Sequence, residues 1–236
     1  MKVLIDRERL RRRAAASHAA SLGGLLIILG AVVLTMSRPQ WATFTAVLLV
    51  LGFTVSTVGI YFANRWVKKP RPEDTLALGL KGLGDPHRIY HYLLPVDHLL
   101  LTPSGVLVIE IVNLEGRFVY HAGRWRQHMP LGRALRFFVE ETFGDPTARA
   151  QSEATRISEL LDAHLPAGGP PVPVNALVLF VHPNSEVIVE SPPVPVCQPA
   201  QLRKRLPSHL PKMPQARFEQ VRAVLDELAG LARFPT

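Results

Sequence analysis

The stretch VDHLLLTPSGVLVIEIVNLEG, residues 96–116, decides the fold of the region around it. Two apolar runs flank the turn residues Pro103, Ser104 and Gly105, which predicts an antiparallel hairpin. The run VLVIEIV at 106–112 is apolar on both faces, as expected of a central strand. Residues 97–102 are expected to form its neighbour, so a sheet is predicted to grow outward from this hairpin.

The segments on either side of the hairpin alternate between strand and helix patterns. Helices are predicted at 73–83, 147–165, 199–206 and 216–234. Strands are predicted at 88–95, at 176–181 and 187–189, and in a second hairpin at 116–127. This order predicts one α/β domain over residues 73–236, with a mixed sheet flanked by helices.

Asp97 and Glu110 are the residues in the first hairpin that could carry chemistry. If Thr102 pairs with Gly105, Asp97 falls opposite Glu110, and opposed Cβ atoms lie about 4.5–5.5 Å apart. Two like charges, one of them in an apolar strand, need compensation. One reading is that the two carboxylates bind Mg²⁺. The other is that an arginine pairs with Glu110 while Asp97 faces water.

Two uncharged segments near the N-terminus predict a membrane anchor. Residues 14–37 and 41–64 contain no Asp, Glu, Lys or Arg, and each exceeds the roughly 20 residues that a helix needs to cross a bilayer. Because only residues 38–40 separate them, they predict an antiparallel transmembrane hairpin over 14–64. A cleaved signal peptide is the alternative for the first segment, but no small-residue cleavage site follows it.

Charge supports an orientation for this anchor. The net charge is +8, yet residues 72–236 carry 16 Lys/Arg against 17 Asp/Glu. The excess lies in the basic segment 1–13 and in the proline-containing linker 65–72, on either side of the hairpin. Basic flanks favour the cytoplasmic side. Both termini and the domain 73–236 are therefore expected in the cytoplasm, at the inner membrane.

Several motifs of the domain resemble the NERD, or nuclease-related, family. They are Val96-Asp97-His98-Leu99-Leu100, Pro103-x-Gly105-Val106-x-Val108-Ile109-Glu110, Asn113-x-x-Gly116, Trp125 and Asp145-Pro146-x-x-x-x-Gln151. The resemblance implies a restriction-endonuclease-like fold and a metal site of the D…(D/E)xK type, with Mg²⁺ as cofactor. It implies that Asp97 and Glu110 are the catalytic metal ligands and that Gln151 and Glu73 support them.

The chain departs from this family pattern at one position. Val112 stands where the family has a lysine, two residues after the acid and on the same face of the strand. That lysine would polarise water and neutralise phosphate charge, which valine does not do. A relocated cation could substitute, and Arg117 and Arg88 are the nearest in sequence. We therefore expect a pseudo-enzyme that does not cleave efficiently.

Three functions are compatible with these patterns. The first is a membrane-anchored module that binds nucleic acid or a protein partner without cleavage. The second is an active Mg²⁺-dependent nuclease with a relocated cation, and the third is a structural or signalling module without nucleic acid. The near-neutral domain favours the third, and the carboxylate pair favours the first two.

Residues 116–139 form a basic block without acids. It could face lipid headgroups, line a nucleic-acid groove or remain a solvated hairpin. Its cations are Arg117, Arg124, Arg126, Arg133 and Arg136.

Overall fold

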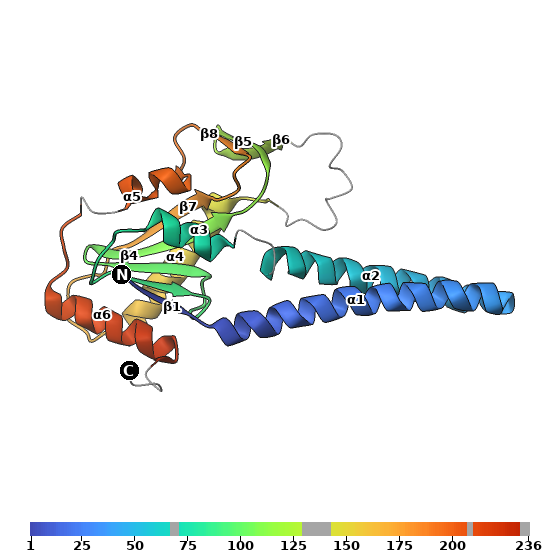
Figure 1. The fold of residues 1–236 in the computed structure, drawn as a ribbon. Coiled ribbons are helices and arrows are strands. Elements are labelled where there is room, and N and C mark those ends of the chain that lie inside the picture. Colours follow the sequence, from blue (N-terminus) through green and yellow to red (C-terminus); the bar gives the residue numbers. More distant parts are fainter. Residues whose placement is uncertain (67–70, 129–142, 207–209, 232–236) are drawn as a thin grey trace. The chain divides into compact units, whose positions relative to one another are not determined.

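A computed structural model of the chain describes residues 1–66, 71–128, 143–206 and 210–231. Its contacts divide these residues into two units, each described by itself (Figure 1). The helical unit contains the described part of residues 7–71. The sheet unit contains residues 1–6 and the described residues from 72 onward, apart from the segment around 130–142 that lies outside the description.

The helical unit is an antiparallel pair joined by a short turn. It consists of α1 (Arg7–Ser37), the 3₁₀ turn η1 (Pro39–Trp41) and α2 (Ala42–Trp66). Small residues line the contact: a Cβ atom added at Gly59 would lie 2.3 Å from the Ser21 nitrogen, and one at Gly24 would lie 2.4 Å from the Ser56 nitrogen. Small residues let two helix backbones approach closely.

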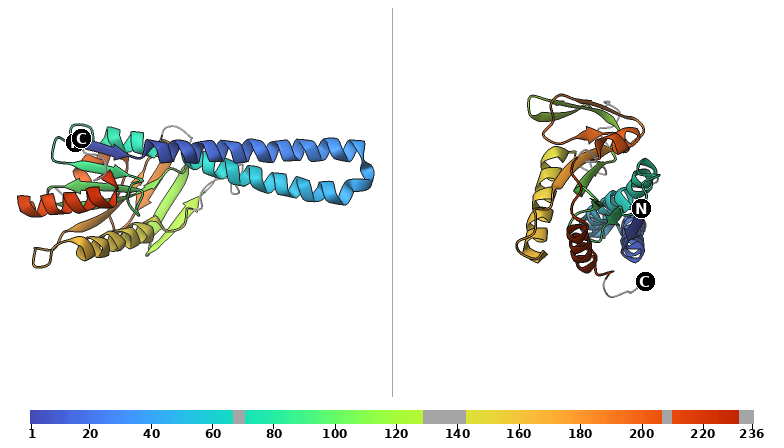
Figure 2. Two further views of the ribbon diagram at one scale, coloured as in Figure 1. Left: turned by 90° about the horizontal axis from the view of Figure 1, so that it is seen from below. Right: turned by 90° about the vertical axis from the view of Figure 1, so that its left-hand side faces the viewer.

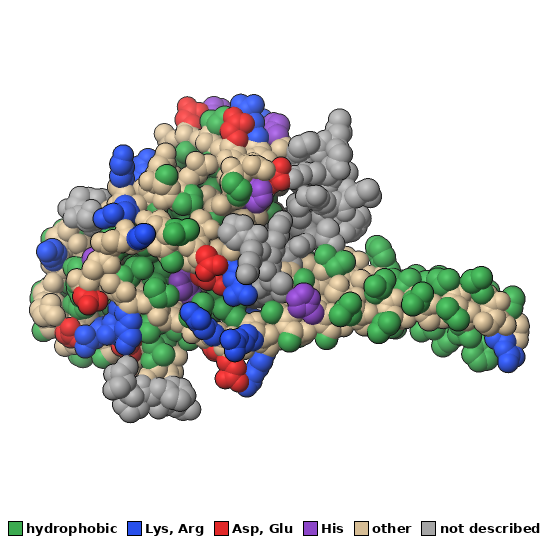
Figure 3. Space-filling view, in the orientation of Figure 1, with side chains coloured by type: hydrophobic (Ala, Val, Ile, Leu, Met, Phe, Trp, Pro, Cys, Tyr) green, Lys and Arg blue, Asp and Glu red, His purple; other side chains and the backbone are tan. Residues whose placement is uncertain are grey.

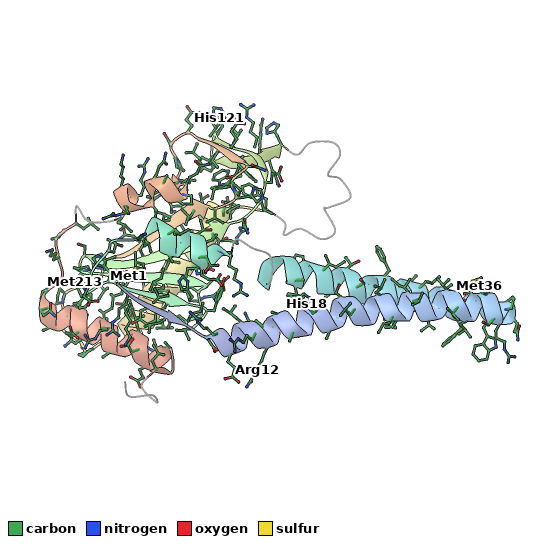
Figure 4. The ribbon with its side chains drawn as sticks, in the orientation of Figure 1. Met1, Arg12, His18, Met36, His121 and Met213 are labelled. Atoms are coloured by element: carbon green, nitrogen blue, oxygen red, sulfur yellow. The ribbon has the colours of Figure 1, made fainter. Side chains whose placement is uncertain are left out.

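The outer surface of this helical pair is apolar. Hydrophobic side chains cover most of it in Figure 3, and Leu26, Val50 and Phe53 are each more than half exposed. Both helices are long and apolar enough to cross a membrane. Figure 4 places Met36 close to the turn that joins them. The two predicted apolar helices are thus present, with α1 starting as early as Arg7.

The sheet unit is built on a mixed six-stranded sheet in the order β1-β2-β3-β4-β7-β9. The strands are β1 (Lys2–Ile5), β2 (Arg88–His91), β3 (His98–Thr102), β4 (Gly105–Val112), β7 (Val174–Phe180) and β9 (Val196–Cys197). The pairs β2–β3 and β3–β4 are antiparallel, and the other neighbours are parallel. The central strand is β4, as the run at 106–112 predicts.

Helices cover both faces of this sheet (Figure 2). On one face, α4 (Pro146–His164) and α6 (Gln215–Leu228) pack on side chains that include Leu99 and Val108. On the other face, α3 (Pro72–Gly79) and α5 (Leu202–Arg205), with the 3₁₀ turn η3 (Pro199–Gln201), pack on side chains that include Leu100. The predicted fold class, a mixed α/β sheet flanked by helices and preceded by two long apolar helices, is confirmed.

A second, separate sheet is formed by three strands that follow β4 in the chain. Its order is β6-β5-β8, formed by β5 (Gly116–His121), β6 (Arg124–His128) and β8 (Ser185–Val189). Its inner side contributes Phe118 to an aromatic cluster with Phe143 and Phe180. This cluster also contains Val112.

The structure departs from the predicted elements at several places. Strand β2 ends at His91 rather than at residue 95, because Tyr92 adopts a φ of 59° and its amide donates to the Asp97 carbonyl at 2.9 Å. Helix α3 ends at Gly79 and α6 at Leu228, earlier than predicted. Strand β1 was not predicted, because the basic residues dominate the pattern of residues 1–13. It pairs in parallel with β2, and Leu4 packs on the core.

Candidate functional site

The turn between β3 and β4 sets the geometry of the candidate site. Thr102 pairs with Gly105 and Leu99 with Val108, which is the register that the sequence predicts. Successive side chains alternate between the faces of a strand. Glu110 therefore shares the face of Val108, against which α4 packs, and Asp97 lies one residue before the start of β3.

Glu110 is held by an arginine from α4. The Arg149 Nε donates to Glu110 Oε1 at 2.7 Å, and Arg149 Nη1 donates to the Phe143 carbonyl at 2.9 Å. The Glu110 side chain is 16% exposed and that of Arg149 is 45% exposed. Glu110 thus has the arginine partner that one of its two readings expected.

The start of α4 explains why Arg149 reaches this position. Asp145 caps the helix, and its Oδ1 accepts from the Ala148 amide at 2.9 Å and from the Thr147 hydroxyl at 2.6 Å. A cap of this kind fixes where the helix begins. Arg149 then lies at the end of the first turn, with Glu153 one turn further along the same face.

Glu153 adds a third carboxylate to the site. Burial, followed by repulsion from Glu110 and Asp97, raises the pKa of its carboxyl to about 7, while Arg156 and Arg149 act in the opposite direction. Both predicted acids therefore act on Glu153, a carboxylate that sequence reasoning missed. We refer to Asp97, Glu110 and Glu153 as the carboxylate cluster.

The two predicted supporting residues have different surroundings. Glu73 is buried in the first turn of α3, where it accepts from the Tyr92 hydroxyl at 3.5 Å. Gln151 is exposed on α4. Because two residues turn an α-helix by about 200°, Gln151 points away from the face that carries Arg149 and Glu153. The described geometry thus gives Gln151 no part in the cluster.

A buried histidine pair lies next to Tyr92. His91 and His98 face each other with 2.8 Å between their Nδ1 atoms, and the Tyr92 ring lies 4.9 Å from that of His98. Burial, with repulsion from His98, lowers the pKa of His91 to about 3. His91 is therefore neutral at pH 7 and supplies no positive charge near the site.

Val112 does not take part in the site. Its side chain is 3% exposed and packs in the cluster of Phe118, Phe143 and Phe180. A charged side chain there would lose both its solvation and its packing. The position that corresponds to the family's lysine is a core position in this chain.

The two candidates for a relocated cation pair with acids other than Glu110. Arg88 pairs with Asp226 at 2.7 Å, and Arg117 pairs with Glu186 at 3.5 Å. The cation at the site is Arg149, which lies 39 residues from Glu110 in sequence. Proximity in sequence to Glu110 therefore did not identify this cation. The pattern that could have identified it is the helix start at Asp145-Pro146, followed by Arg149 and Glu153 at helical spacing.

The donor set does not fit a resident metal ion in this arrangement. Among the residues that the structure describes, no group of three or more His, Cys, Asp or Glu side chains is arranged to hold one. Glu110, a predicted ligand, already binds Arg149. The expected Mg²⁺ site at Asp97 and Glu110 therefore remains a prediction.

The fold and the site define an α/β domain with a carboxylate cluster at the end of its central strand. Residues 77–181 match the family model of NERD, the nuclease-related domain. The match covers β2 to β7 and includes Asp97, Glu110 and Arg149 but not Glu73. No curated protein and no solved structure matches the chain.

Proposed function

We propose that the chain is a membrane-anchored nuclease-related module that binds nucleic acid without efficient cleavage. The observation that carries this proposal is the Glu110–Arg149 ion pair, which neutralises the acid of the motif. With Val112 in the core, strand β4 supplies no cation to polarise water or to neutralise a phosphate. The nuclease-like fold is retained while the chemistry of cleavage is lost.

The helical unit supplies the proposed anchor. Its exposed side chains are mostly apolar, and its contact face consists of small residues that pack well inside a bilayer. The basic segments that flank it favour the cytoplasmic side of the inner membrane for both termini. The parallel pairing of β1 with β2 supports this orientation, because it requires residues before and after the helical unit to be on one side.

The proposed contact surface is the outer face of the three-stranded sheet. Arg124 and Arg126 alternate along the edge strand β6, and both are exposed. Arg117 and His121 on β5 (Figure 4 labels His121) pair with Glu186 on β8 and with Glu190, which directly follows β8. The β6 edge therefore offers cations that are not neutralised by a described acid, suited to phosphates spaced along a strand. Arg133 and Arg136, also predicted for this surface, lie outside the described residues.

Salt-dependent binding tests this assignment. Full-length protein in detergent should bind single- or double-stranded nucleic acid at 50 mM salt and much more weakly at 200 mM. Arg124→Gln with Arg126→Gln should lower the magnitude of the salt slope by about 2, since each lost phosphate contact removes about 1. Lys204→Gln, an exposed cation on α5, is the matched control.

Two results would contradict the proposal. One is a failure of the protein to bind nucleic acid at low salt. The other is equal loss of binding in the Lys204→Gln control. Binding to vesicles with anionic lipids, but not to nucleic acid, would instead assign the cations to lipid headgroups. A protein partner would be indicated if neither polyanion bound.

The gathering of Asp97, Glu110 and Glu153 favours a second candidate, a Mg²⁺-dependent nuclease. In this alternative, Asp97 and Glu110 would bind the metal and Arg149 would move to the phosphate. The bound metal would activate water for phosphodiester hydrolysis. Cleavage that requires MgCl₂ and disappears in Asp97→Ala would establish this candidate in place of the first.

A further inference from the structure

Two contacts hold the Arg149 guanidinium in place. Its Nε donates to Glu110 Oε1 at 2.7 Å and its Nη1 to the Phe143 carbonyl at 2.9 Å. The Asp145 cap fixes the start of the helix that carries it. An arginine bound at two points from a capped helix is positioned by the fold, because planar guanidinium donors have a fixed geometry.

The charges around Arg149 nearly balance within the chain. Asp97, Glu110 and Glu153 supply the acids, and Arg149 and Arg156 act on Glu153 with the opposite sign. Arg156 Nη1 also donates to the Pro95 carbonyl at 3.4 Å, in the loop that leads to Asp97. Two guanidinium groups therefore offset most of the carboxylate charge that would otherwise attract a cation.

A divalent cation at Glu110 would compete directly with Arg149. Both need the Glu110 carboxylate, and a Mg²⁺ ion beside a fixed guanidinium is repelled by it. Mg²⁺ also gives up its water reluctantly and demands octahedral geometry. The arrangement of the described acids, in which no metal-binding group of three is formed, agrees with this competition.

We propose that Arg149 is the resident counter-ion of the carboxylate cluster and occupies the place of a divalent cation. Mg²⁺ then gains access to the carboxylates of Asp97 and Glu110 only when the charge of Arg149 is removed. This inference deepens the proposed function, on which it rests, by giving the reason why cleavage is absent.

Thermal unfolding with and without metal tests the inference. The full-length protein is purified in detergent, stripped with EDTA and melted with increasing MgCl₂ or MnCl₂. The wild type should show no change in Tm beyond that of a KCl control of equal ionic strength. Arg149→Gln should gain at least about 2 °C at saturating metal, because a ligand that binds only the folded state stabilises it.

Three further variants identify the site of metal uptake. Adding Asp97→Ala to Arg149→Gln should abolish the gain in Tm. Arg149→Lys keeps a positive charge and should remain insensitive to metal. Arg222→Gln removes an arginine that pairs with Glu219 on α6, and it should behave like the wild type. If Arg149→Gln does not fold, Arg149→Met keeps the aliphatic stem and serves in its place.

The inference is overturned if the wild type itself is stabilised by MgCl₂ through Asp97. It is also overturned if folded Arg149→Gln or Arg149→Met gains nothing, or if both remain unfolded in MgCl₂ and in EDTA alike. None of these melts contains nucleic acid. A failure here therefore concerns Arg149 alone, whereas a failure of the salt-dependent binding test concerns the proposed function.

Discussion

Arg88 on β2 and Asp226 on α6 form an ion pair with 2.7 Å between Nη1 and Oδ2. The other carboxylate oxygen of Asp226 accepts from the Tyr90 hydroxyl at 2.8 Å. Burial and this hydrogen bond raise the pKa of Tyr90 far above its usual range, so the hydroxyl remains a donor. Together these contacts fasten the last described helix to the sheet.

Removing the charge of Asp226 should therefore destabilise the sheet unit. We expect Asp226→Asn to lower the free energy of unfolding by about 1–2 kcal/mol, because Arg88 loses a partly buried partner. Glu219→Gln breaks an ion pair with Arg222 on the exposed side of the same helix and should cost less than about 0.5 kcal/mol. Urea unfolding of the two variants makes the comparison. Equal losses of unfolding free energy in the two variants would show that the Asp226 contacts stabilise the protein no more than a surface ion pair does.

Glu153 should make stability depend on pH. Its folded pKa of about 7 lies above the ordinary value of 4.5, so the folded state holds the proton more tightly than the unfolded state. The resulting stability is fully present below about pH 4.5 and is lost as pH rises through 7. We expect Glu153→Gln to raise the unfolding free energy by about 1–2 kcal/mol at pH 8, after a discount for solvent screening.

The same substitution should change little at pH 4.5, where Glu153 is mostly protonated in the folded state. Glu159→Gln, at an exposed position of the same helix, provides the control in melts at both pH values. An effect of Glu153→Gln that is the same at pH 4.5 and pH 8 would argue against a raised pKa of the Glu153 carboxyl.

The close contact in the helical unit predicts a difference between two glycines. A Cβ atom at Gly59 would lie 2.3 Å from the Ser21 nitrogen, whereas one at Gly30 would have no neighbour within 4 Å. Gly59→Ala should therefore force the helices apart and lower the Tm of the helical signal in detergent micelles. Gly30→Ala should leave it unchanged or raise it, because alanine favours helix by about 1 kcal/mol over glycine. Equal effects at both positions would mean that the helices do not pack at Gly59.

Strand β1 predicts a similar contrast between two neighbouring residues. Leu4 packs on the main core, whereas Val3 is 46% exposed. Leu4→Ser should lower the unfolding free energy by about 2 kcal/mol and Val3→Ser by well under 1 kcal/mol. Hydrogen exchange at the β2 amides gives a local measurement, since only loss of β1 should expose them. Unchanged exchange in Leu4→Ser would contradict the β1–β2 pairing.

Local patterns in the sequence were enough to predict the centre of the fold. The turn at Pro103, Ser104 and Gly105 sets the register of β3 against β4, and the apolar run at 106–112 identifies the central strand. Both depend on neighbours within a few residues. That Glu110 and Val112 share one face of β4 followed from strand alternation alone.

Contacts between distant segments were not predictable in this way. Arg149 and Glu153 reach Glu110 because α4 packs across β4, and no local pattern specifies that crossing. Strand β1 has only four residues between a methionine and a basic run, and its partner begins at Arg88. Gln151 was placed at the site by resemblance, but its position on the helix turns it outward.

The pairing of β1 with β2 has a consequence for synthesis of the chain. The ribosome completes β1 first and then makes both apolar helices before the residues of β2 emerge. At about 5–20 residues per second, β1 waits for roughly 4–16 s before its partner exists. If the two helices form the proposed anchor, they insert during that interval, and β1 pairs with β2 only afterwards.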